Sequence, residues 1–335
     1  MRLVPPAVKD ASSYEAPMDR TSSPPPARIL TGTRARPRWS GAAAGLEGYV
    51  YLAPALLILV VFVVVPAIWV LVLSFYRWDL ISSDATFIAG GNYLRMWNDP
   101  LWWKSLWQTC YFVAVSVPLG MILALLLAMV LNAPLRGRAL FRGAIFSPYI
   151  TPSVATIVIW EWIFNKDYGL LNAVLAVFHL PAVAWLNSPT WIMPSIILYS
   201  LWVHTGFNAV IFLSGLANIP RELQDAARVD GAGPWQVFWN VTWPLLSPTT
   251  YFVLLISTIG SFKVFNVVFV LTSGNGGVSG GPDRAAMTIG VYLYKQAFEF
   301  FRAGYASAIS VALFAIILAL TLVQMRVASR RVFYQ

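Results

Sequence analysis

Charged side chains are scarce in this sequence. They make up 11% of the 335 residues, whereas a soluble domain contains about 25%. Hydrophobic residues reach 58%, and the mean hydropathy is +0.67. This composition excludes an ordinary soluble domain, because a soluble fold needs enough polar surface to cover its exterior. We therefore predict an all-α integral membrane protein.

Residues and motifs that usually carry chemistry are also rare. The single cysteine, Cys110, cannot form an internal disulfide, and the two histidines, His179 and His204, are too few for a His-rich metal site. The sequence contains no Gly-Lys dipeptide and therefore no phosphate-binding loop for ATP. It also lacks HExxH, GxSxG and paired-carboxylate motifs. We predict no catalytic residue, no metal site and no cofactor bound by this chain.

Six apolar stretches are long enough to cross a membrane. A spanning helix needs about 20 apolar residues, because the hydrocarbon core is about 30 Å thick and a helix rises about 1.5 Å per residue. The stretches are continuous and do not alternate, so we predict helices. The six predicted transmembrane helices are Val50–Phe75, Leu106–Leu131, Ala144–Phe164, Trp191–Leu216, Thr249–Leu271 and Ala303–Met325.

The distribution of basic residues predicts the orientation of these helices. One side of the membrane receives 15 Lys and Arg residues and the other receives 7. Because basic residues collect on the cytoplasmic side, both termini are predicted to be cytoplasmic. The short loop Asn132–Gly143, with three arginines and no acid, agrees. Topology and membrane lipid therefore account for the net charge of +9, and no nucleic-acid partner is indicated.

Three regions follow from this division of the chain. Residues 1–46 combine Pro24–Pro26 with serines and scattered charges, so we predict a disordered cytoplasmic tail. Residues 47–330 are predicted to form the six-helix membrane domain. Residues 331–335 are predicted to form a short C-terminal tail.

The segment 218–244, between the fourth and fifth predicted helices, reads as a cytoplasmic helix–turn–helix elbow. Pro220 and Glu222 suit a first helical turn, and Gly231 suits a helix end. Pro234 then begins a second short helix. One face of the first helix carries small apolar side chains at helical spacing. They are Leu223, Ala226 and Ala227. On this pattern alone, packing against its own chain is favoured over docking of another protein.

This segment resembles the EAA loop of ABC-importer membrane subunits. In that loop Gly follows EAA after three residues, Ile follows after nine more, and Leu-Pro follows after one more. Here Asp225-Ala226-Ala227, Gly231, Val241 and Trp243-Pro244 stand at the same spacings. Asp replaces Glu, Val replaces Ile, and Trp replaces Leu. In that family the EAA helix docks into a separate ATPase subunit. The resemblance therefore assigns ATPase coupling to Glu222, Asp225, Ala226, Ala227, Asp230, Gly231 and Pro244.

Residues 48–330 resemble the binding-protein-dependent sugar permeases of the maltose and glycerol-phosphate types. The motifs that carry this resemblance are Asn132-Ala-Pro-Leu-Arg-Gly-Arg138, Ser147-Pro-Tyr-Ile-Thr-Pro-Ser153, Leu271-Thr-Ser-Gly274 and Phe301-Arg-Ala-Gly-Tyr305. The resemblance implies a six-helix MetI-like ABC permease fold in a bacterial cytoplasmic membrane. It implies ATP-driven import of a disaccharide, an oligosaccharide or glycerol 3-phosphate. It also implies a second permease subunit as heterodimer partner, two ATPase subunits that bind ATP and Mg, and an external solute-binding protein.

The resemblance also carries substrate-contacting positions onto three helices. In the maltose-type subunit these positions correspond here to Tyr149, Ser153, Val203, His204, Phe207, Ser257, Ser261 and Val264. Tyr149 with Ser153, and Ser257 with Ser261, are four residues apart, so each pair is predicted to share a helix face. Ordinary hydrogen bonding between helices is the alternative for each polar member. His204, Ser261 and Val264 depart from the maltose-type residues, which leaves the identity of the sugar open.

Lys263 joins this set on physical grounds. It is predicted to lie within the fifth helix, where a charge at the bilayer centre costs about 2.5–3.5 kcal/mol. We therefore expect its side chain to face a cavity or a partner, where an anionic ligand would suit it.

Two other functions stay open. An ion-coupled secondary carrier would need no ATPase, but it leaves the EAA spacing unexplained. An enzyme acting on lipid-linked sugars would need acidic residues at the membrane edge. Its only loose candidates are Asp79, Asp84 and Glu161.

Overall fold

A computed structural model describes residues 41–81, 84–133, 137–274 and 279–328. The chain divides into two units, Met1–Ile58 and Leu59–Gln335, which are treated separately. In the first unit, helix α1 (Gly41–Leu59) begins at Gly41, whereas the tail was predicted to extend to residue 46. The rest of that predicted tail and the predicted C-terminal tail 331–335 lie outside the described residues.

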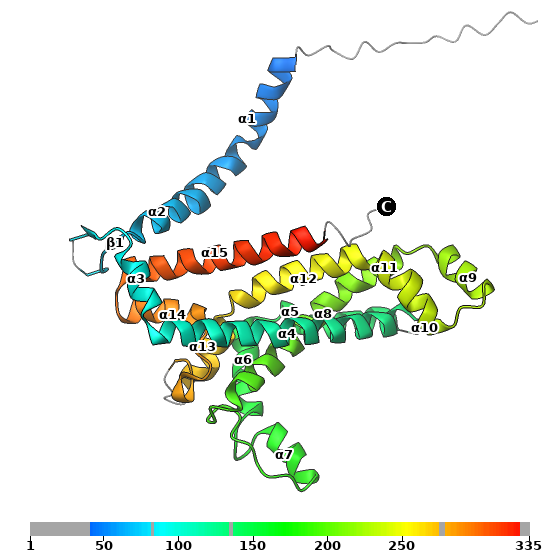
Figure 1. The fold of residues 1–335 in the computed structure, drawn as a ribbon. Helices are drawn as coiled ribbons and strands as arrows, with labels where there is room; N and C mark the ends of the chain where they lie inside the picture. The colour runs from blue at the N-terminus through cyan, green and yellow to red at the C-terminus, as the bar shows by residue number, and fades with distance from the viewer. Residues whose placement is uncertain (1–40, 82–83, 134–136, 275–278, 329–335) are drawn as a thin grey trace, which may run out of the picture. The chain divides into compact units, whose positions relative to one another are not determined.

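Helices make up nearly all of the second unit (Figure 1). A single described hairpin pairs β1 (Tyr76–Arg77) with β2 (Thr86–Phe87), antiparallel. Segments of π-helix occupy Val60–Val64, Phe238–Thr242 and Lys295–Glu299, and a 3-10 turn occupies Pro282–Arg284. The α-helices are α2 (Val65–Leu73), α3 (Gly91–Trp97), α4 (Pro100–Asn132), α5 (Arg138–Ile150), α6 (Ser153–Ile163), α7 (Leu170–Val177), α8 (Ile192–Ala217), α9 (Arg221–Val229), α10 (Pro234–Val237), α11 (Trp243–Leu245), α12 (Ser247–Phe262), α13 (Asn266–Ser273), α14 (Ile289–Tyr294) and α15 (Ala303–Ala328).

Within the described ranges, five helical stretches are long and apolar enough to cross a membrane. They are Tyr51–Leu73, Pro100–Asn132, Ile192–Ala217, Ser247–Ser273 and Ala303–Ala328. Each overlaps one of the predicted transmembrane helices. A sixth span exists only if α5 and α6 are counted together, because they are bent by 95° at the break between them.

The third predicted helix, Ala144–Phe164, is therefore wrong as a continuous element. Its break follows from Pro152, which has no N–H to donate and forces the residue before it out of the helical region. Thr151 is accordingly extended, with φ −73° and ψ 140°. Its side-chain hydroxyl donates to the Ser147 carbonyl at 2.8 Å, which caps the end of α5.

The fifth predicted helix is also interrupted, because α12 ends at Phe262 and α13 begins at Asn266. Lys263 therefore lies in a break and not within a helix, as had been predicted. The carbonyl of Val264, freed from helical hydrogen bonding, accepts a bond from the Thr288 hydroxyl at 3.3 Å. Gly290 lets α14 approach, since a Cβ there would lie 2.8 Å from the same carbonyl oxygen.

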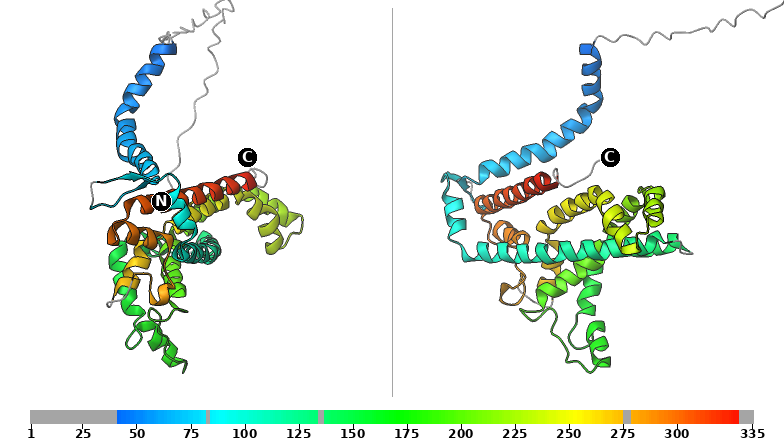
Figure 2. Two further views of the ribbon diagram at one scale, coloured as in Figure 1. Left: turned by 60° about the vertical axis from the view of Figure 1, so that its left-hand side comes forward. Right: turned by 45° about the vertical axis from the view of Figure 1, so that its right-hand side comes forward.

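Helices α4 and α8 lie side by side and form the centre of the unit (Figure 2). On α4, Ser116, Gly120, Ala124 and Ala128 repeat every four residues, and all four are buried. Small side chains at this spacing let two helices approach closely without a large hydrophobic driving force. The apolar core continues from this stripe into α8, where Phe212 is 1% exposed. At one end of the stripe, Ser116 and Gly120 line a cavity.

A polar cluster ties the start of α4 to α14 and α15. Asp99 caps α4 by accepting from the Leu101 N–H at 2.9 Å. It also accepts hydrogen bonds from the hydroxyls of Tyr292 and Tyr305, the latter at 2.9 Å. Burial acts to raise the pKa of Asp99, but these hydrogen bonds outweigh it and hold the pKa below its usual value. Burial and the neighbouring carboxylate raise the pKa of Tyr292. Arg95 completes the cluster, 4.7 Å above the Tyr305 ring.

Candidate functional site

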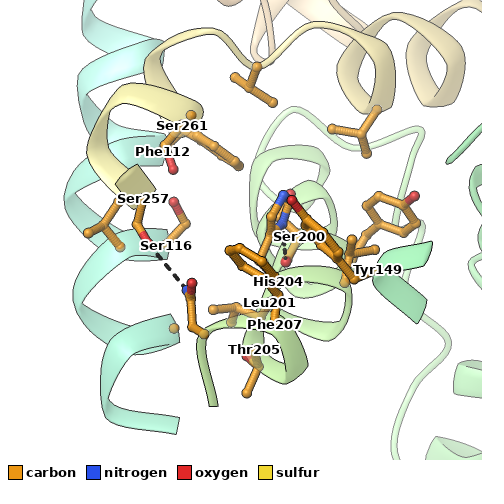
Figure 3. A pocket seen from close by; sticks show the side chains of 18 of the residues that line it. Phe112, Ser116, Tyr149, Ser200, Leu201, His204, Thr205, Phe207, Ser257 and Ser261 are labelled. Atoms are coloured by element: carbon orange, nitrogen blue, oxygen red, sulfur yellow. Dashed lines mark hydrogen bonds between the residues drawn. The ribbon is translucent and has the colours of Figure 1, made fainter. Parts of the chain in front are cut away.

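A cavity of about 660 Å³ opens between α4, α8 and α12. Its volume falls within the range of about 300–1,000 Å³ that is usual for small-ligand sites. The two helix breaks also border it, since Ser153 follows the α5–α6 break and Lys263 lies in the α12–α13 break. Figure 3 shows Ser116 and Ser257 on one side of the cavity and Tyr149 on the other.

One wall of the cavity is aromatic. The rings of Tyr149 and Phe207 are stacked, with centroids 4.3 Å apart and an interplanar angle of 14°. Tyr149 is the second-last residue of α5, so the break after Ile150 leaves its ring free to lie against α8. Gly206 allows this contact, because a Cβ there would lie only 1.9 Å from the Ile145 carbonyl oxygen. The close approach of α5 and α8 therefore builds an aromatic platform.

His204 lies beside this platform, with its ring 6.1 Å from that of Tyr149. Its Nδ1 is 2.9 Å from the carbonyl oxygen of Ser200. Because a carbonyl can only accept, Nδ1 carries the proton in this contact. In the neutral ring Nε2 is then a hydrogen-bond acceptor.

The opposite wall supplies hydroxyl and amide groups. The Asn208 amide donates to the Ser257 hydroxyl at 3.2 Å and so joins α8 to α12. Ser261 lies one turn beyond Ser257 on the same helix, and both line the cavity. Two other lining residues, Ser116 and Thr205, have buried hydroxyls with no hydrogen-bond partner among the described residues, and Thr205 lies beside Phe207 (Figure 3). Such groups are costly unless a ligand or water satisfies them.

Lys263 is the one Lys or Arg among the described residues of the lining. Its side chain is exposed, and no acidic side chain in the described ranges forms a salt bridge with it. The ammonium group is therefore available to a ligand. The same ranges contain no group of three or more His, Cys, Asp or Glu side chains that could hold a metal ion.

A second feature, the elbow between α8 and α12, ends its first helix in a complete Schellman motif. Gly231 is left-handed at φ +86° and donates to the Arg228 carbonyl at 3.0 Å. Ala232 donates to the Ala227 carbonyl at 2.9 Å. These two bonds satisfy carbonyls that a helix end would otherwise leave unpaired. Gly231 therefore ends α9 as predicted, whereas Pro220 precedes the helix and does not sit in its first turn.

The surface of α9 is largely uncovered. Leu223 is 43% exposed, Ala226 is exposed and Ala227 is partly exposed. Asp225 forms a salt bridge with Arg228 at 2.9 Å, but both side chains are more than 60% exposed. An exposed pair of this kind contributes at most about 1 kcal/mol. The small apolar face is thus covered only in part by the described chain.

Comparison with known proteins decides the family. The profile of the binding-protein-dependent transport system inner membrane component matches residues 116–333. The chain belongs to this family. It is a multi-pass membrane permease of the ABC transporter class, with the mostly helical MetI-like fold.

Relatives of the permease match it over most of its length. The sulfoquinovosyl glycerol transport system permease protein of Agrobacterium fabrum is 32% identical, covering 87% of this chain and 92% of the relative. The lactose transport system permease protein of Rhizobium radiobacter is 34% identical, covering 85% and 95%. The trehalose/maltose transport system permease protein of Thermococcus litoralis is 32% identical, covering 85% and 94%.

A solved structure agrees on the fold. It is a bacterial ABC transporter involved in the import of the acidic polysaccharide alginate. One of its chains is 21% identical to the permease, with a TM-score of 0.75, covering 87% of this chain and 98% of that one.

The nine predicted substrate-pathway residues of the permease all line the one cavity. Tyr149 and Ser153 reach it from the two sides of a helix break, so the prediction that they share a helix face is wrong. Sequence reasoning missed Ser116, Asn208 and Thr205. Asn208 could have been found, because an amide in an apolar span needs a polar partner. Ser116 carries no such signal, since its role follows from the end of the α4 stripe.

Proposed function

We propose that the permease moves a sugar or sugar-like solute through the cavity between α4, α8 and α12, as a subunit of an ATP-driven importer. The observation that carries this proposal is the pairing of a stacked aromatic platform with the hydroxyl-bearing residues Ser257 and Ser261 across one cavity (Figure 3). Sugars have an apolar face of C–H groups and a rim of hydroxyls, so they suit both walls. The sugar-transport names of the three relatives support the same class of solute.

The proposed topology has six spans, with α5 and α6 together counted as the third, and both termini in the cytoplasm. Figure 1 shows the C-terminal ends of α4 and α8 and the N-terminal end of α12 at one end of the unit, together with α9. The end of α4 is followed in the chain by Arg138 and Arg142 in the first turns of α5, so the positive-inside rule supports a cytoplasmic location for this end.

The ATPase is proposed to dock on α9. The uncovered face of Leu223, Ala226 and Ala227, held in place by the Schellman motif, supports this role. The residues proposed for coupling are Glu222, Asp225, Ala226, Ala227, Asp230, Gly231 and Pro244. ATP and Mg would be bound by two partner ATPase subunits, and this chain would supply no catalytic residue. A second permease subunit and an external solute-binding protein complete the proposed assembly.

The test of the cavity is uptake of labelled sugar by the assembled transporter in vesicles containing ATP. Phe207→Ala removes the stack with Tyr149 and should lower kcat/KM roughly 2- to 12-fold, because an aromatic pair is worth about 0.5–1.5 kcal/mol. Phe314→Ala is the matched control, since Phe314 is 65% exposed on α15 and is not among the residues that line the cavity. Equal loss in both variants would remove the cavity from the pathway, and uptake without ATP would favour an ion-coupled carrier.

Docking on α9 has its own test. Gly231→Asp should reduce both ATPase association and transport, because it disturbs the helix end and adds a negative charge there. Gly137→Asp is the matched control, since Gly137 is also left-handed (φ +79°) with open space around its Cα. Ala227→Asp, on the apolar face, should behave like Gly231→Asp. Full ATPase association in both α9 variants would count against the assignment.

Lys263 is proposed to receive an anionic group when the solute carries one. Lys263→Met should then lower uptake of glycerol 3-phosphate and leave uptake of a neutral disaccharide unchanged. Loss of the same size for both solutes would reject this role.

A further inference from the structure

The second half of the elbow carries an aromatic face whose residues neither line the cavity nor belong to α9. It consists of Trp235, Phe238, Trp239 and Trp243, and we call these four residues the aromatic face. Their rings form one continuous cluster, with centroids 5.6 Å apart for Trp235–Trp239 and 5.7 Å apart for Trp239–Trp243. Phe238 lies 5.2 Å from Trp239 and closes the cluster.

Two of the four rings are uncovered by the described chain, whereas those of Phe238 and Trp243 are partly buried. Trp235 is 72% exposed and Trp239 is 44% exposed. The residues that anchor the segment are Val237, between these two tryptophans, and Thr242, after the second, which are only 6% and 8% exposed. The segment therefore packs through Val237 and Thr242 and exposes the rings of Trp235 and Trp239.

Two observations identify what covers the rings. No charged residue occurs from Gly231 to Phe262, so the aromatic face runs without a charge into the membrane-spanning stretch Ser247–Ser273. By contrast, the nine residues of α9 include Arg221, Glu222, Asp225 and Arg228. A surface continuous with a membrane span and free of charge suits lipid, whereas a protein-docking surface beside it carries the charges.

The indole N–H groups point to the same partner. Those of Trp235, Trp239 and Trp243 donate to no acceptor among the described residues. Indole combines an apolar body with one polar donor, which is why Trp collects at the boundary between lipid headgroups and acyl chains. There the rings are buried while the N–H groups reach phosphate or ester oxygens.

We propose that the aromatic face binds the headgroup–acyl boundary of the leaflet at which α12 begins. The face holds α10 in the plane of the membrane surface and leaves α9 exposed to the cytoplasmic solution. This inference goes beyond the proposed function, because it holds whichever solute is carried.

The test measures lipid contact at single positions in the assembled transporter. In a Cys110→Ser background, Trp235→Cys and Trp239→Cys are each labelled with bimane and reconstituted in phosphatidylcholine vesicles containing lipids with a nitroxide at acyl carbon 5. Val229→Cys is the control, since Val229 is an apolar residue of α9 that is 87% exposed. We expect quenching by the nitroxide lipid to be at least threefold stronger at positions 235 and 239 than at 229, and quenching by aqueous iodide to show the reverse order.

Two results would overturn the proposal. Equal nitroxide quenching at 235 and 229 would place the aromatic face in water. Protection of position 235 from both quenchers, lifted when the ATPases are removed, would make the ATPase its partner. Trp235→Cys is the decisive variant if Trp239→Cys does not fold, because Trp235 makes fewer internal contacts. The readout involves neither solute nor ATP, so its failure leaves the proposed function standing.

Discussion

Replacing Gly206 with alanine should separate α5 from α8. The added Cβ would lie 1.9 Å from the Ile145 carbonyl oxygen, whereas ordinary contact begins at 3.4 Å. The two helices must therefore move apart by about 1.5 Å at this point. Overpacking of this kind costs about 1–3 kcal/mol. The shift would also open the Tyr149–Phe207 stack, which lies within one turn of the contact.

Gly143→Ala provides the matched control for this prediction. Gly143 lies on α5 itself, with nothing within 4 Å of the position of its Cβ. Both substitutions gain about 1 kcal/mol of helix propensity, so their difference isolates the clash. At about 2–4 °C per kcal/mol, Gly206→Ala should melt roughly 2–12 °C below Gly143→Ala.

The assay is the thermal midpoint of the purified transporter, followed by sugar uptake at a temperature where both variants are folded. Gly206→Ala should also raise the KM for solute, while Gly143→Ala leaves it unchanged. A midpoint for Gly206→Ala at or above that of Gly143→Ala would refute the close approach of the two helices. An unchanged KM would refute the link from that approach to the aromatic platform.

Three further outcomes are expected. Ser257→Ala removes the hydrogen bond from the Asn208 amide that joins α8 to α12. It should lower the stability measured in thermal unfolding by about 0.6–1.7 kcal/mol. An unchanged stability would mean that this hydrogen bond does not contribute. Gly231→Ala should cost about 1–2 kcal/mol from left-handed strain alone, read as weaker protection of α9 in hydrogen exchange, whereas unchanged protection would exclude the strain. The pKa of Asp99 is lowered in the folded protein, so its ionised carboxylate stabilises the fold at pH values above its ordinary pKa of 3.8. The difference in stability between wild type and Asp99→Asn should therefore shrink as the pH falls below about 4. A difference that does not change with pH would contradict this role of Asp99.

Local sequence rules predicted the elements that depend on local chemistry. The long apolar runs indicated the spans, and Gly231 indicated the end of α9. The break at Thr151 was also readable, because Pro152 excludes the helical conformation of the residue before it. The apolar run from residue 144 to 164 is continuous, and it led to the prediction of one helix where the structure has two, α5 and α6.

The break at Lys263 could not have been predicted in this way. Neither proline nor glycine occurs among Lys263, Val264 and Phe265. What favours the break is distant in sequence, since Thr288 supplies the hydrogen bond that the Val264 carbonyl loses and Gly290 makes room for it. Tertiary contacts of this kind override local helix propensity, and the hydrophobic periodicity of the sequence does not reveal them.

The two breaks together explain why polar groups can line this cavity within a membrane. A continuous helix satisfies its own backbone and has no need of polar neighbours, whereas a broken one needs partners or a water-filled space. At the second break the Thr288 hydroxyl bonds the Val264 carbonyl. At the first, the Ser147 carbonyl keeps its helical bond from the Thr151 N–H and also accepts one from the Thr151 hydroxyl. Ser153, just after the first break, and Lys263, within the second, both line the cavity. Tyr149, Ser153, Lys263 and Val264 therefore reach the cavity at or beside a helix break, whereas the other five predicted site residues reach it from continuous stretches of α8 and α12.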